Sequence, residues 1–152
     1  MRVTIALAAF LMVGASAILM AQVTSASAAE QQLFAEANRA RKAQGLAELK
    51  WDEALAAAAR RHAGVMAQHG SAEHGFAGEP NLASRANKAG AHFVYLAENV
   101  IKGTSAEGIQ GQFLKSALHR ANMLDTDMDS IGVGVVERGG QMFAVENFSK
   151  AK

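Results

Sequence analysis

The 152-residue sequence contains no cysteine and only one proline, one tryptophan and one tyrosine. Without cysteine the chain forms no disulfide bridge, has no nucleophilic thiol, and cannot be anchored through a lipid-modified amino-terminal cysteine. The 15 basic residues include Arg2 in a predicted leader, and the rest are balanced by 14 acidic residues. This neutral balance gives no reason to expect nucleic acid or an anionic membrane as a partner.

Residues 1–29 have the pattern of a secretory signal peptide. An uncharged apolar stretch over residues 3–21 leads into small residues that end at Ala28 and Ala29, where cleavage is expected. The alternative is an uncleaved membrane anchor, because the apolar run approaches the length that spans a bilayer. We expect cleavage to release one domain, residues 30–152, as a secreted or periplasmic protein. It would be a monomer with no stable membrane span.

Capping residues and glycines mark the ends of four expected helices. These helices cover residues 31–44 before Gly45, residues 52–69 before Gly70, residues 81–88 before Gly90, and residues 105–118 after Thr104 or Ser105. The segment from 71 to 96, outside the short helix, reads as a long loop, and long loops are often functional.

Alternating apolar residues near the end of the chain predict a β-hairpin over residues 131–148, with its turn at Gly139 and Gly140. The period of two puts Ile131, Val133 and Val135 on one face. That face has to be covered, so the hairpin is expected to belong to a larger antiparallel sheet flanked by the second and fourth helices.

Three side chains in separate segments are candidates for a polar site: His74, Glu98 and His119. Imidazoles and carboxylates bind divalent metals and transfer protons near neutral pH. Sequence spacing alone does not bring the three together. His62 and His69 share one helix face, but two turns separate them by about 10 Å, too far to share one ion. We therefore interpret both, and also His92, as structural.

Several phrases resemble the CAP superfamily of cysteine-rich secretory, venom-antigen and plant pathogenesis-related proteins, in its cysteine-free bacterial SCP-like branch. The resemblance covers the chain after the leader, in order. Its phrases are Asn38-Arg39-Ala40-Arg41 with Gly45-Leu46, Leu49-Lys50-Trp51-Asp52, Ala97-Glu98-Asn99-Val100, His119-Arg120-Ala121-Asn122-Met123-Leu124, Ile131-Gly132-Val133-Gly134-Val135 and Val145-Glu146-Asn147-Phe148. It implies an α+β fold, an α-β-α sandwich with a central antiparallel sheet between helical layers and a surface groove.

The resemblance places the family's groove histidines and glutamate on His74, His119 and Glu98, with Asn99, Arg120 and Asn122 as supporting residues of the motifs. Ser116 stands where many eukaryotic members carry a second groove glutamate, which puts a complete four-residue site in doubt. On an alternative, structural interpretation, Glu98 and Asn99 hydrogen-bond neighbouring loops, and Arg120 and Asn122 fix the turn after the helix.

Three functions remain open from the sequence. The first is an exported binding domain whose groove holds a divalent metal such as zinc, or a small, lipid-like ligand. The second is a metal-assisted hydrolase in which His74 and His119 hold the ion and Glu98 serves as ligand or general base. The third is an envelope protein with an idle site. No serine nucleophile motif is present, so covalent catalysis is disfavoured.

Overall fold

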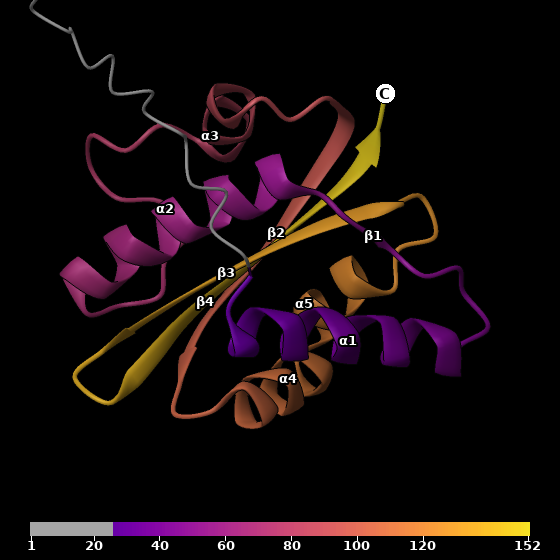
Figure 1. The fold of residues 1–152 in the computed structure, drawn as a ribbon, viewed down its shortest axis with the longest axis horizontal. Helices are drawn as coiled ribbons and strands as arrows, with labels where there is room; N and C mark the ends of the chain where they lie inside the picture. The colour runs from indigo at the N-terminus through magenta and orange to yellow at the C-terminus, as the bar shows by residue number, and fades with distance from the viewer. Residues whose placement is uncertain (1–25) are drawn as a thin grey trace, which may run out of the picture.

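The computed structural model describes residues 26–152, so most of the predicted signal peptide lies outside the described residues. A central sheet lies between two layers of helices (Figure 1). The elements in chain order are α1 (Ala28–Ala43), β1 (Lys50–Trp51), α2 (Glu53–His69), α3 (Leu82–Ala89), β2 (Phe93–Gly103), α4 (Ala106–Lys115), α5 (Ala117–Met123), β3 (Ser130–Arg138) and β4 (Gln141–Ala151). Helices α2 and α3 cover one face, and α1, α4 and α5 cover the other.

The four strands described run in the order β1-β3-β4-β2. Strands β3 and β4 form the predicted hairpin, and β2 pairs antiparallel with β4. Gly139 and Gly140 make the turn with φ of 57° and 74°, a conformation that glycine adopts without strain. Strand β1 pairs with β3 in parallel over two residues, so the sheet is mixed rather than wholly antiparallel as predicted. The α-β-α sandwich itself is confirmed.

Most helix ends lie where the capping residues placed them. The side chains of Asp52 and Asn81 accept hydrogen bonds from the first turns of α2 and α3, and Gly70 and Gly90 end these helices in the left-handed conformation. Helix α1 begins earlier than predicted, at Ala28, because Ser27 and Glu30 form a reciprocal capping box.

Two predicted segments were wrong. The single helix expected over residues 105–118 is two helices, because Ser116 takes an extended conformation with ψ of 121° and its hydroxyl caps α5. His119 and Arg120 therefore lie within a helix, not after one. The expected loop up to residue 96 also ends early, since Phe93 already begins strand β2.

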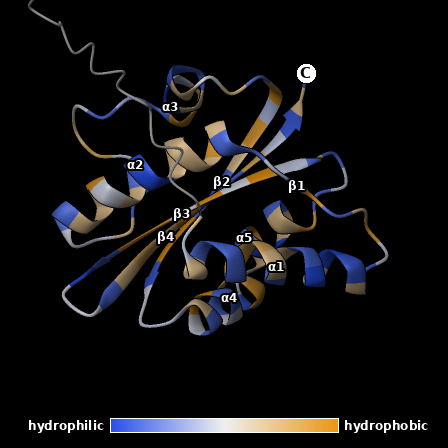
Figure 2. Cartoon of the chain, viewed as in Figure 1, coloured by the Kyte–Doolittle hydropathy of each residue, from blue (hydrophilic) through white to orange (hydrophobic). Residues whose placement is uncertain are grey.

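Helix α2 packs unusually close to the sheet, because two glycines of β3 face it. A Cβ atom on Gly132 would lie 2.1 Å from the backbone nitrogen of Ala56, and one on Gly134 would lie 2.2 Å from that of Arg60. Apolar residues follow the central strands (Figure 2). Their buried side chains belong to hydrophobic clusters that pack against the helices. Within residues 26–152, none of the helices is both long enough and apolar enough to cross a membrane.

Candidate functional site

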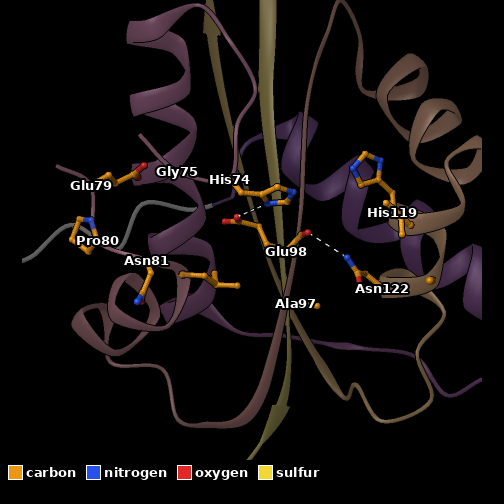
Figure 3. A pocket seen from close by; sticks show the side chains of 12 residues that line it. His74, Gly75, Glu79, Pro80, Asn81, Ala97, Glu98, His119 and Asn122 are labelled. Carbon is orange, nitrogen blue, oxygen red and sulfur yellow. Dashed lines mark hydrogen bonds and ion pairs between the residues drawn. The ribbon is translucent and has the colours of Figure 1, made fainter. Parts of the chain in front are cut away.

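An open cleft of about 760 Å³ contains all three predicted site residues (Figure 3). The segment leading into α3 forms one wall, α5 forms the other, and strand β2 lies between them. His74 belongs to the first wall, His119 to the second, and Glu98 to the strand. The lining residues are His74, Gly75, Glu79, Pro80, Asn81, Leu82, Ala97, Glu98, Leu118, His119, Ala121 and Asn122.

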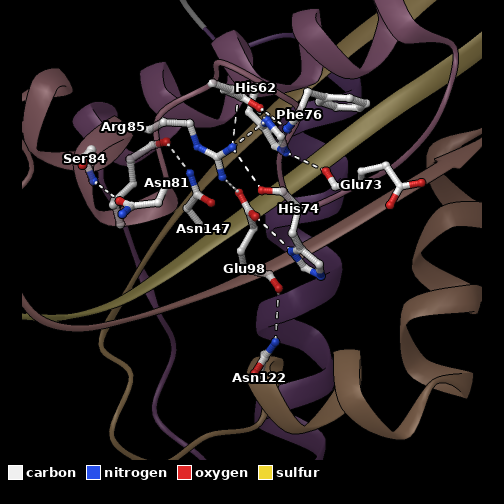
Figure 4. Close-up of polar contacts among 12 residues, drawn as sticks. His62, Glu73, His74, Phe76, Asn81, Ser84, Arg85, Glu98, Asn122 and Asn147 are labelled. Atoms are coloured by element: carbon white, nitrogen blue, oxygen red, sulfur yellow. Dashed lines mark hydrogen bonds and ion pairs between the residues drawn. The ribbon is translucent and has the colours of Figure 1, made fainter.

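His74 is held by a buried carboxylate. Its Nδ1 lies 3.0 Å from Glu98 Oε1, and Arg85 Nη2 donates to the other carboxylate oxygen at 2.6 Å (Figure 4). Arg85 also donates to the backbone carbonyl of His74 at 3.3 Å. The imidazole is 64% exposed, whereas Glu98 and Arg85 are 4% and 6% exposed. Glu98 thus has both oxygens engaged and orients His74 from beneath.

Arg85 was not identified from the sequence. It lies on the short helix α3, and nothing in its neighbourhood distinguishes it from a solvated arginine. Its partner Glu98 is on another element, so only the tertiary fold shows that this side chain is buried.

His62 has the structural role that the sequence predicted. The buried imidazole lies with Nδ1 2.7 Å from Glu79 Oε1 and Nε2 2.9 Å from the carbonyl oxygen of Glu73. It therefore ties the segment that carries His74 to helix α2. His69 stacks on Phe76 at 4.2 Å outside the cleft, and the His92 side chain is exposed.

His119 is fixed mainly through its backbone. Its N–H donates to the Ser116 hydroxyl at 3.4 Å and its carbonyl accepts from Asn99 Nδ2 at 3.0 Å, while its ring lies edge-on to Phe113. Burial, and then the proximity of His74, lower the pKa of His119. The imidazole is therefore neutral near pH 7, the form that binds metals.

A line of amides beneath the cleft ends at a buried acid. Asn122 Nδ2 donates to Asn99 Oδ1 at 2.9 Å and to the Glu98 carbonyl at 3.3 Å. Asn99 Nδ2 donates in turn to Glu146 Oε2 at 3.1 Å. Glu146 is fully buried, and burial raises its pKa to about 8. Asn99 and Asn122 thus brace the α5 wall, which agrees with the structural interpretation of these residues.

Arg120 is not among the residues that line the cleft. Its guanidinium donates to the carbonyl of Leu114 at 2.7 Å and bridges the break between α4 and α5. Among the groups expected from the sequence, His74 and His119 are the imidazoles that line the cleft, and Nε2 of each makes no hydrogen bond within the described residues. Nδ1 of His119 is buried and also has no hydrogen-bond partner there. No three acidic or imidazole side chains of the described residues are arranged to hold an ion.

The sequence model of the cysteine-rich secretory protein (CAP) family matches residues 34–148, most of the chain. The chain belongs to the CAP family. No curated protein matches this CAP domain closely enough to add to the assignment.

Solved structures agree with the family. An extracellular protein containing an SCP domain from Bacillus anthracis is 27% identical with a TM-score of 0.73, over 80% of this chain and 40% of that one. The CAP domain described here thus spans less than half of that protein. An outer surface protein from Borrelia burgdorferi is 22% identical with a TM-score of 0.76, over 85% of this chain and 97% of that one.

A third similar structure is a crystal structure of NaASP2 with Zn²⁺. It is 11% identical with a TM-score of 0.60, over 82% of this chain and 80% of that one. At this identity the comparison shows the shared fold alone.

Proposed function

We propose that this protein is an exported binding domain whose cleft takes up a divalent cation, zinc first, through Nε2 of His74 and Nε2 of His119. The observation that carries the proposal is the pair of imidazoles on facing walls of one cleft, each with Nε2 unengaged. The description of similar proteins as extracellular or outer-surface proteins supports a location outside the cytoplasm. Zinc is the first choice because neutral imidazoles are common zinc ligands.

The surroundings of both histidines suit this role. A metal-binding imidazole commonly has its second nitrogen held by a carboxylate, and Glu98 occupies that place beside His74 Nδ1. The lowered pKa of His119 keeps its imidazole available near neutral pH. With two protein ligands, the remaining coordination positions would be open to water or to a small ligand.

The same contacts favour binding over hydrolysis. A metal-assisted hydrolase would need Glu98 as a third ligand or as a general base on water. Both oxygens of Glu98 are already engaged, one by His74 and one by Arg85. Apolar groups of Pro80 and Leu118 also line the cleft. They suit a ligand with an apolar part.

Calorimetric titration with Zn²⁺ tests the proposal. The wild type should bind near pH 7 and release the ion below about pH 6, where protons compete for the imidazoles. His119→Ala should abolish binding and keep the fold by circular dichroism. His69→Ala is the matched control, because His69 is exposed and lies outside this cleft. Equal heats for wild type and His119→Ala, or no heat for either, would contradict the proposal.

A further inference from the structure

The floor of the cleft is the free edge of the sheet. Strand β2 is the last strand in the order β1-β3-β4-β2, so one of its edges pairs with β4 and the other has no strand beside it among the described residues. Ala97 and Glu98, which line the cleft, are part of that strand. The unpaired edge therefore runs between the α3 wall and the α5 wall (Figure 3).

The direction of the backbone groups on this edge follows from two hydrogen bonds. The carbonyl of Ser149 accepts from Asp129 N–H on the β3 side, so Ser149 turns its backbone groups away from its β2 partner Leu96. The carbonyl of Glu98 accepts from Asn122, on the far side of β2 from β4. Since backbone groups alternate along a strand and no bulge separates these residues, Leu96 and Glu98 both face outward.

Three strong polar groups on the edge are consequently unpaired: the N–H and C=O of Leu96 and the N–H of Glu98. None of them has a partner among the hydrogen bonds of residues 26–152. Exposed strand edges pair readily with other chains, and proteins usually protect them with charges, proline or a covering element. Here the sequence at the start of the strand is apolar, Phe93-Val94-Tyr95-Leu96.

Exposed apolar side chains gather around the same edge. The large hydrophobic residues exposed within the described range are Val94 at 66%, Tyr95 at 54% and Leu118 at 80%. Val94 and Tyr95 belong to β2, and Leu118 stands on the α5 wall of the cleft. Leu82 lines the opposite wall. Exposed apolar side chains therefore lie both on the start of the edge strand and on the walls of the cleft.

We infer that the cleft binds an extended peptide segment, which adds to the outer edge of β2 as a further strand. The backbone of the peptide pairs with Leu96 and Glu98, and its alternate side chains lie against Leu82 on one wall and Leu118 on the other. This inference goes beyond metal binding and does not depend on it, because main-chain pairing uses none of the histidine nitrogens.

The recessed position of the edge selects a single segment over a second copy of the domain. Two sheets can join edge to edge only where both edges project, and at Ala97 and Glu98 the walls bearing Leu82 and Leu118 stand on either side of the strand. A separate extended chain fits between those walls, with one backbone edge toward β2 and the other toward solvent.

Amide hydrogen exchange with a defined panel of peptides tests the inference. The panel consists of acetylated, amidated hexapeptides that alternate threonine with valine, leucine, phenylalanine or tyrosine. In the free ¹⁵N-labelled protein, the N–H groups of Leu96 and Glu98 should exchange faster than those of Ala97 and Asn99, which are protected by β4. At least one peptide should slow exchange at Leu96 and Glu98 by about tenfold or more, also in the presence of a metal chelator.

N-methylated versions of that peptide separate backbone pairing from side-chain contact. Methyl groups on alternate amides leave one peptide edge able to pair, whereas the same number on consecutive amides blocks both edges. We expect the first version to retain the protection and the second to lose it. Leu118→Asp should weaken peptide affinity by about fivefold or more, since it puts a charge on an apolar wall. Ala35→Asp, at an exposed position on α1, should leave affinity unchanged.

Three results would overturn the inference. One is unchanged exchange at Leu96 and Glu98 with every peptide of the panel. Another is equal protection by the alternately and the consecutively methylated peptides. The third is protection that rises with protein concentration alone, together with a dimer in sedimentation, which would assign the edge to a second copy. Loss of zinc binding with peptide binding intact would remove only the metal proposal.

Discussion

The buried acid beneath the cleft gives a sharp prediction about stability and pH. Glu146 is 0% exposed and has one hydrogen-bond partner, Asn99, and burial raises the pKa of its carboxyl from 4.5 to about 8. The folded protein therefore keeps a proton at Glu146 that the unfolded chain loses. The resulting stabilisation is complete below pH 4.5 and is lost as the pH rises through about 8.

The expected magnitude is large. A separation of this size between the folded and unfolded pKa values changes the free energy of unfolding by on the order of 5 kcal/mol between pH 4.5 and pH 8. Total stabilities of single domains are of similar size. Glu146→Gln removes the titration and keeps an oxygen that can accept from Asn99. Relative to the wild type, this variant should gain several kcal/mol between pH 5 and pH 9.

Urea unfolding at a series of pH values from 5 to 9 measures this gain. The test is the pH dependence of the difference between the two proteins, since an unpaired amide in the variant adds a constant cost. The contribution of His119 to the pH dependence of stability has the opposite sign, because its lowered pKa gives stability that is lost as the pH falls below 6.5. This contribution is common to both proteins and cancels. Glu107→Gln, at an exposed position, is the control. Parallel stability curves for wild type and Glu146→Gln would refute the reasoning.

Further predictions concern packing, a buried arginine and processing. Gly132→Ala should destabilise by on the order of 3 kcal/mol or more, because its Cβ meets the α2 backbone. Gly111→Ala, in open space on α4, should be neutral or stabilise by up to about 1 kcal/mol; chemical denaturation compares the two. Arg41→Lys should lower the free energy of unfolding, measured by chemical denaturation, by on the order of 3 kcal/mol. One ammonium cannot replace a guanidinium that donates to four backbone carbonyls. Mass spectrometry of the exported protein should give a chain that begins at residue 29 or 30; a chain that still begins at Met1 would support the anchor.

Local signals in the sequence predict the elements whose ends are marked by capping residues or glycines. Asp52 and Gly70 enclose α2, Asn81 and Gly90 enclose α3, and the glycine pair at 139 and 140 closes the hairpin. These residues act on their own backbone, within a few positions, so their effect is readable without the fold.

The features that were missed depend on contacts between distant segments. The break at Ser116 follows neither proline nor glycine. The sequence predicts a loop as far as residue 96, whereas β2 begins at Phe93. Its polar residues Glu98 and Asn99 are buried against partners on other elements, which the local sequence does not show. The convergence of His74, Glu98 and His119 came from the family resemblance, since no spacing rule joins them. One oxygen of Glu98 accepts a hydrogen bond from Arg85, and only the fold shows that these two residues are in contact.

The walls that carry the two histidines are held by different side chains, which belong to neighbouring residues of strand β2. The His74 wall is tied through Arg85 to Glu98, and the His119 wall is tied to Asn99. Because side chains alternate along a strand, these adjacent residues point to opposite faces of the sheet. Substitution of the Arg85 or Glu98 side chain therefore leaves the bond from Asn99 to the His119 carbonyl in place. One wall of the cleft can therefore change in sequence while the other wall keeps its contacts to β2. Ligand preference can diverge in this way while both histidines are retained.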